Sequence, residues 1–189
     1  MNYQQMIHSH LNLWEAYVQH QFVQQLVSHT LPASVFKSYL LQNLTLVNKA
    51  FSLLVDLKKS NHDPVQRYMI EQYQEALSLE IEHHTSYFIQ QGFTEHDLQR
   101  VPWVEGTKGY CHVLEEASHS LHIMDFFMVL SVHIIGYAEI GNRIDLSLIK
   151  PSHAYLSWIQ VYTHSSYSCL LYTSPSPRDG TSSRMPSSA

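Results

Sequence analysis

Cysteine is scarce in this sequence, which holds only Cys111 and Cys169 and no Cys-x-x-Cys pair. So few thiols argue against a disulfide framework and are typical of a protein in a reducing compartment. The first residues, MNYQQMIHSHLNLW, also lack a cationic segment followed by an apolar one, so no signal peptide is expected. We therefore expect a cytoplasmic protein.

Basic residues and long apolar runs are scarce as well. Lys and Arg total 11 against 16 Asp and Glu, and no basic stripe occurs, so nucleic acid is not an expected partner. The most apolar run, residues 123–135, is interrupted by Asp125, Ser131 and His133. It looks too short and too polar to span a bilayer, so we expect no membrane partner.

Strand patterns are absent too, because no segment alternates apolar and polar residues over a sustained length. Apolar residues instead recur at three- and four-residue steps, as in Leu11, Trp14, Val18 and Phe22. The spacing predicts helices over about residues 3–29, 33–58, 64–91, 94–99, 109–120 and 124–142, and a last one starting at Pro151. These helices predict an all-α bundle.

Helix boundaries can be assigned at two places. Asp63 and Pro64 are typical of an N-cap and a first helical position, so a helix should begin there. Gly92 is typical of the position that ends a helix, because glycine adopts the left-handed backbone conformation easily. We therefore expect one long helix between these two points.

The composition changes abruptly at residues 170–189, LLYTSPSPRDGTSSRMPSSA, which are rich in Ser and Pro and show no periodicity. Such a segment cannot bury enough apolar surface to order itself. The run CLLYTSPSPRDG is typical of adaptor or vector read-through, so we expect native sequence to stop near residues 166–168. The predicted organisation is one helical domain over residues 1–168, incomplete at its C-terminus, followed by a disordered, non-native tail over residues 169–189.

Polar residues within the apolar stretch at residues 124–144 mark the first candidate site. His133 lies in the middle of the run, Tyr137 follows one helical turn later, and Glu139 comes next. A buried polar group without a partner is costly. The stretch is therefore either a core helix with satisfied polar groups or the wall of a small-molecule pocket.

Four stretches in order carry a resemblance to a known family. They are HQFVQQLVSHTLPASVFKSYLLQN at residues 20–43, EIEHH at 80–84, IIGYAEIG at 134–141 and AYLSWIQVY at 154–162. They resemble motifs of the TenA family of thiaminase II and aminopyrimidine aminohydrolases, in the TENA/THI-4/PQQC group. The resemblance implies a haem-oxygenase-like helical bundle without a cofactor. It also implies a homo-oligomer that takes a small aminopyrimidine-type ligand in thiamin salvage or degradation.

Several positions depart from the family pattern. Asn43 stands where the family has its catalytic aspartate, and His133 stands where the cysteine-dependent branch has its nucleophile. Leu44 and Leu46 replace an aromatic pair, and the family's late glutamate has no counterpart before the tail. The resemblance therefore implies a divergent, C-terminally truncated member whose chemistry has changed.

Site residues follow from these matches and departures. The predicted catalytic residues are His133, as a general base on water, together with Tyr137 and Glu80. The predicted substrate-binding residues are Asn43, Tyr110, Tyr137, Tyr162 and Glu139.

Five of these residues also have a structural interpretation that stays open. His133 can be a core histidine bonded to a carbonyl, and Asn43 can make a hydrogen bond between helices. Tyr110 and Tyr137 can be packing aromatics with a wet hydroxyl. Glu139 points away from Tyr137 on a helix, so it can form a salt bridge instead.

Two other functions remain as alternatives. His112, Glu115, Glu116, His119 and His122 fall at helical steps, and Glu80 shares a face with His84, which would suit a haem-oxygenase-like di-iron oxidase. A solvated helix face is the better interpretation of these residues, so no metal site is expected. A non-catalytic, small-molecule-binding homologue is the other alternative, because the aspartate and cysteine are missing.

Overall fold

The computed structural model describes residues 3–163, which fold into helices and connecting turns with no strand among them. The helices are α1 (Tyr3–Ser9), α2 (Leu11–Val18), α3 (Gln21–Val27), α4 (Ala33–Ser60), α5 (Pro64–Gln90), α6 (Glu95–Gln99), α7 (Glu105–Ser118), α8 (Ile123–Asn142) and α9 (Leu156–Thr163), with a 3-10 turn at Leu146–Leu148. The predicted all-α class is therefore confirmed. The tail predicted over residues 169–189 lies outside the described residues.

The chain divides into two compact units. One is Thr30–His133, and the other joins Met1–His29 to the segment from Ile134 onward. The helix α8 contributes to both, because the boundary falls between His133 and Ile134. We describe each unit separately.

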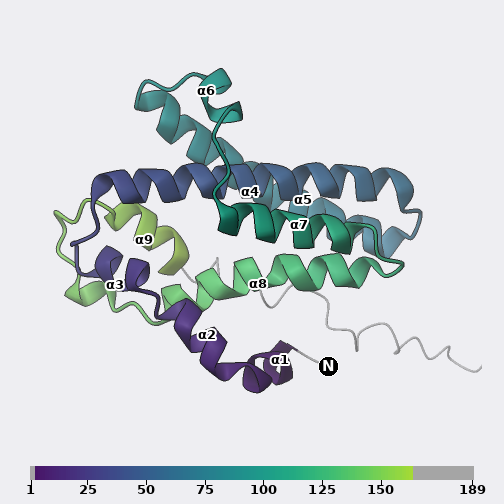
Figure 1. The fold of residues 1–189 in the computed structure, drawn as a ribbon, viewed down its shortest axis with the longest axis horizontal. Helices are drawn as coiled ribbons and strands as arrows, with labels where there is room; N and C mark the ends of the chain where they lie inside the picture. The colour runs from purple at the N-terminus through teal and green to yellow at the C-terminus, as the bar shows by residue number, and fades with distance from the viewer. Residues whose placement is uncertain (1–2, 164–189) are drawn as a thin grey trace, which may run out of the picture. The chain divides into compact units, whose positions relative to one another are not determined.

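The unit Thr30–His133 is built on α4, which lies along α5 and α7 (Figure 1). Its apolar side chains recur every three or four residues on each helix, so one face of each helix is buried. The most deeply buried include Leu54, Ile70, Phe88, Leu114 and Phe126, all at 1% exposure or less. The helices packed around this core carry the predicted site residues Asn43, Glu80, Tyr110 and His133.

Capping residues set the helix ends in this unit as the sequence predicts. The Asp63 carboxylate accepts hydrogen bonds from the Val65 and Gln66 amides at 2.9 Å each, and Pro64 takes the first position of α5. Gly92 follows α5 with φ of 86°, a conformation that glycine adopts without strain. The predictions for α4 and α5 are confirmed to within a few residues.

Helix α7 begins earlier than predicted. The expected start was residue 109, but α7 starts at Glu105. Gly106 and Gly109 disfavour a helix locally, yet Thr107, Cys111 and Leu114 bury one face of it. Packing therefore overrides the weak local propensity at this end.

The second unit corrects the prediction of one helix over residues 3–29, because three short helices occupy that segment. The Ser9 hydroxyl bonds back to the carbonyls of Gln5 and Met6 and so competes with the backbone ladder at the end of α1. His20 adopts an extended backbone, and its ring nitrogen accepts from the Phe22 amide at 3.2 Å as the N-cap of α3. The apolar period continues across both breaks, which is why periodicity alone missed them.

The last described helix starts later than predicted. We expected a start at Pro151, but α9 begins at Leu156. The side chain of His153 intervenes, because its Nδ1 accepts from the Tyr155 amide at 3.1 Å and its Nε2 lies 3.0 Å from the Leu26 carbonyl oxygen. These bonds hold residues 150–155 in turns, and the helix can start only after them.

Helix α8 is long and apolar enough, by length and composition alone, to cross a membrane, and it is the one such helix within residues 3–163. The expectation that its apolar run is too short and too polar to span a bilayer was therefore wrong by length and composition. Core helices of soluble proteins pass the same test, so this is weak evidence for a membrane span. Phe126, Phe127, Leu130 and His133 are all buried, which is the pattern of a core helix.

Candidate functional site

The first part of the candidate site is a hydrogen-bonded pair between α4 and α5. Asn43 is buried, and its Nδ2 donates to Oε1 of Glu80 at 2.8 Å. Asn43 occurs on the same apolar face as Leu40, Leu44 and Val47, so the backbone of α4 directs its amide toward the interior. The hydrogen bond between helices, which the sequence left open for Asn43, is therefore present.

Two buried histidines belong to the same unit. His84 lies one turn after Glu80 on α5 and is 3% exposed, and His133 on α8 is 8% exposed. Burial, together with the smaller effect of the neighbouring His83, lowers the pKa of His84 to about 4. Burial, together with the smaller effect of His84, likewise lowers the pKa of His133 to about 4. Both imidazoles are therefore uncharged at neutral pH.

The carboxyl of Glu80 is shifted in the opposite direction. Burial raises its pKa, and the hydrogen bond from Asn43 opposes that shift only in part. The unit thus holds one carboxyl that resists ionisation and two imidazoles that resist protonation. Perturbed pKa values of this kind are typical of functional sites, although imidazoles with a pKa of about 4 are weak bases at neutral pH.

His84 is the residue that sequence reasoning placed least well. From the sequence it is included only in the stretch at residues 80–84 and as a possible metal ligand on the same helix face as Glu80, and it is not predicted as a site residue. Its Nδ1 is buried and has no hydrogen-bond partner among the described residues. Its four-residue spacing from Glu80, a predicted catalytic residue, was the signal that could have identified His84.

Tyr110 lies in α7 and anchors that helix to α8. Its hydroxyl donates to the Val129 carbonyl oxygen at 2.7 Å. This bond ties the hydroxyl to a backbone position one turn before His133. A structural role for Tyr110 is therefore visible, and its predicted contact with substrate stays a prediction.

In the second unit, Tyr137, Trp158 and Tyr162 form an aromatic cluster. The Tyr137 and Tyr162 ring centroids are 4.9 Å apart, and those of Trp158 and Tyr162 are 4.4 Å apart. The backbone of Tyr162 lies so close to Gly141 that a Cβ there would overlap it, so the glycine of the sequence IIGYAEIG permits the approach of α8 and α9. The structure therefore brings the predicted residues Tyr137 and Tyr162 together.

Glu139 takes the structural role that the sequence left open. Its carboxylate accepts from Nε of Arg143 at 2.7 Å. The same guanidinium binds both carboxylate oxygens of Glu15, at 2.7 and 2.8 Å, and holds the pKa of Glu15 down at about 2. Glu139 is thus part of an ion-pair network that joins α2 to the end of α8.

The metal alternative gains no support from the described residues. Nowhere in residues 3–163 do three or more His, Cys, Asp or Glu side chains gather so that they could hold a metal ion. On α7, the Glu115 carboxylate pairs with the Lys49 amine at 3.1 Å. The exposed His112 Nε2 lies 3.5 Å from Oε1 of Glu116. This face of α7 is a solvated one.

The chain is similar to known proteins. The model of the TENA/THI-4/PQQC family matches residues 7–171. An uncharacterised protein of Haemophilus influenzae is 26% identical over 163 residues, which is 84% of this chain and 74% of that protein.

Solved structures resemble this one. A TenA family transcription regulator from Silicibacter sp. TM1040 is 25% identical, with a TM-score of 0.72, over 82% of this chain and 69% of its own. A TenA homologue from P. horikoshii OT3 is 24% identical, with a TM-score of 0.76, and the match covers 89% of this chain and 80% of the homologue. A putative TenA-like thiaminase from Sulfolobus solfataricus is 19% identical, with a TM-score of 0.70, and the match covers 95% of this chain and 86% of that protein. The predicted haem-oxygenase-like, all-α helical fold is confirmed.

Proposed function

Because the chain belongs to the TENA/THI-4/PQQC family, we propose that it hydrolyses or binds an aminopyrimidine in thiamin salvage or degradation. The observation that carries the proposal is the hydrogen bond from buried Asn43 to partly buried Glu80, with His84 and His133 buried in the same unit. Polar groups in an apolar core are costly unless they have a use or a partner. By the resemblance in sequence, Asn43 and His133 correspond to the positions of the family's catalytic aspartate and nucleophile, and Glu80 and His84 belong to the stretch that resembles a family motif.

The chemistry of Glu80 suits an aminopyrimidine. Its raised pKa favours a protonated carboxyl, which can donate to a ring nitrogen while its other oxygen accepts from the adjacent amino group. The Asn43 amide supplies a further donor and acceptor beside it. This pair therefore supports recognition of a ring that presents an acceptor next to a donor.

Hydrolysis would proceed through water rather than through a protein nucleophile. An unprotonated His133 takes a proton from water, whose oxygen bonds to the exocyclic carbon of an aminomethyl-pyrimidine. The carbon–nitrogen bond breaks, and Glu80 gives its proton to the departing amine, which leaves as ammonia.

Catalysis through His133 is expected to be slow. Its pKa of about 4 makes it a weak base, although it is available in the basic form throughout the neutral range. Binding without turnover is the second candidate. It is favoured because Asn43 cannot exchange protons and because no thiol occupies position 133.

The test is ammonia release from an aminomethyl-pyrimidine, and product release from thiamin, by the wild-type chain and its variants. We expect slow release that His133→Ala abolishes and that the exposed-site control His119→Ala leaves unchanged. Activity only in the double variant His133→Cys, Asn43→Asp would support binding without turnover. No activity and no binding in any of these proteins would contradict both forms of the proposal.

A further inference from the structure

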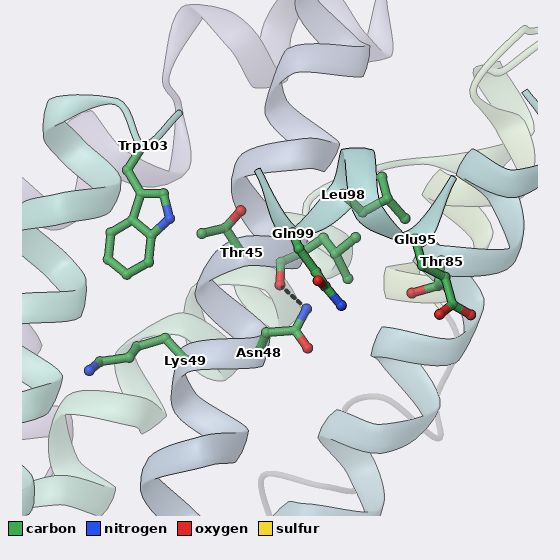
Figure 2. A pocket seen from close by; sticks show the side chains of 9 residues that line it. Thr45, Asn48, Lys49, Thr85, Glu95, Leu98, Gln99 and Trp103 are labelled. Carbon is green, nitrogen blue, oxygen red and sulfur yellow. Dashed lines mark hydrogen bonds between the residues drawn. The ribbon is translucent and has the colours of Figure 1, made fainter. Parts of the chain in front are cut away.

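A separate pocket of about 460 Å³ lies in the unit Thr30–His133 (Figure 2). Its walls come from α4, α5, α6 and the loop before α7, and Asn43, Glu80 and the two buried histidines do not line it. The volume lies in the range of small-molecule sites. Its lining combines apolar side chains, Leu44 and Leu98, with the aromatic ring of Trp103 and several polar groups.

Trp103 is held in position by its neighbours. The Gln42 amide donates to the Pro102 carbonyl at 3.0 Å and accepts from the Val104 amide at 3.1 Å. These two bonds fix the backbone on both sides of Trp103, while the ring itself remains exposed. A fixed, exposed indole offers a preformed aromatic surface to a ligand.

The segment that leads into the other wall is anchored as well. Phe93 follows shortly after the end of α5, and the Lys37 amine lies 4.2 Å from the centroid of its ring. Thr94 then begins α6 through a capping box, in which its hydroxyl and backbone amide bond to Asp97. Helix α6 is therefore held at its start, and Glu95 in its first turn has a defined place in the pocket wall.

The two charged side chains that line the pocket, Lys49 and Glu95, differ in whether they have a salt-bridge partner. Lys49 already pairs with Glu115 at 3.1 Å. Glu95 makes no salt bridge with any residue in the described range 3–163. In Figure 2, Glu95 and Thr85 lie at one end of the pocket, and Trp103 and Lys49 lie at the other. The charge that the pocket leaves without a partner is thus negative.

From these features we propose that this pocket binds a small aromatic ammonium compound. The ring lies against Trp103 and the apolar walls, and the ammonium group is attracted by the Glu95 carboxylate. An aromatic body on a short, flexible amine arm matches both ends of the lining. An anionic analogue is disfavoured, because it would meet Glu95 while Lys49 is already paired with Glu115.

The probes are tryptamine, its neutral analogue tryptophol and its anionic analogue indole-3-propionate, which share one ring and one arm length. Binding is followed by the indole N–H signals of ¹⁵N-labelled protein, assigned by replacing Trp14, Trp103 and Trp158 with Phe one at a time. We expect a saturable shift of the Trp103 signal, with tryptamine bound most tightly and indole-3-propionate least.

The matched variants are Glu95→Gln and Glu105→Gln, which replace exposed glutamates in the first turns of α6 and α7. Glu95→Gln should weaken tryptamine binding about tenfold and leave tryptophol unchanged, and Glu105→Gln should change neither. The proposal is overturned if the three probes bind equally, if both variants lose equal affinity, or if millimolar tryptamine leaves the Trp103 signal in place.

Discussion

The buried histidines predict how the stability of this protein depends on pH. His84 and His133 have folded-state pKa values of about 4, against 6.5 for an ordinary histidine. Between these values the unfolded chain binds protons that the folded chain does not. Each histidine therefore contributes stability that is present above pH 6.5 and is lost as the pH falls toward 4.

The size of the loss follows from the two pKa values. At pH 5, a histidine is mostly protonated in the unfolded chain and mostly neutral in the folded one. This difference lowers the free energy of unfolding by about 2 kcal/mol for each histidine. The two histidines together give about 4 kcal/mol between pH 7.5 and 5, a large part of a typical domain's stability. Glu80 acts in the opposite direction, because its raised pKa favours the folded state as the pH falls.

The assay is urea unfolding of the full chain at pH 7.5 and pH 5, followed by circular dichroism. His84→Leu and His133→Leu should each reduce the difference in unfolding free energy between the two pH values by about 2 kcal/mol. Comparing each variant with itself at two pH values removes the packing cost of the new side chain. The control His119→Leu replaces an exposed histidine and should leave the difference unchanged.

The reasoning is refuted if both buried-site variants keep the full wild-type difference between pH 7.5 and 5. It is also refuted if His119→Leu reduces that difference as much as they do. In either case the two imidazoles would not be protected from protons by the fold.

Two further predictions concern packing and hydrogen bonding. Asn43→Leu removes the hydrogen-bond donor to the partly buried Glu80 carboxyl and should lower the urea-unfolding free energy by about 1–3 kcal/mol. Asn48→Leu, at an exposed position of the same helix, should lower that free energy far less. Equal losses would contradict the assigned role of the Asn43 hydrogen bond. Gly141→Ala places a methyl group against the Tyr162 backbone and should lower the melting temperature. At Gly109 an added methyl group meets no neighbour within 4 Å, so Gly109→Ala should raise the free energy of unfolding by about 1 kcal/mol. A Gly141→Ala protein as stable as wild type would exclude the close approach.

Much of the fold could be predicted because its signals are local. The Asp63–Pro64 start and the Gly92 end of α5 each depend on residues next to the boundary. The start of α9 could not be predicted, because it depends on His153, whose ring lies beside the carbonyl of Leu26, far away in the sequence. Boundaries set by distant partners leave no trace in periodicity.

The candidate site shows the same division. Spacing placed Glu80 and His84 on one face of α5, but only the structure shows that Asn43 of α4 bonds to Glu80. Glu139 could be assigned to an ion pair in principle, since Arg143 follows at the favourable four-residue spacing. Its link through Arg143 to Glu15 depends on the fold and was not visible in the sequence.

The central claim is that Glu80 and its surroundings recognise an aminopyrimidine. A calorimetric titration of an aminomethyl-pyrimidine into wild type, Glu80→Gln and the control Glu71→Gln tests it directly. Glu71 is an exposed glutamate of the same helix, paired with Lys58 at 3.0 Å. We predict saturable binding that Glu80→Gln weakens at least about tenfold and Glu71→Gln leaves unchanged. Absence of binding to wild type, or equal affinity in all three proteins, would contradict the account.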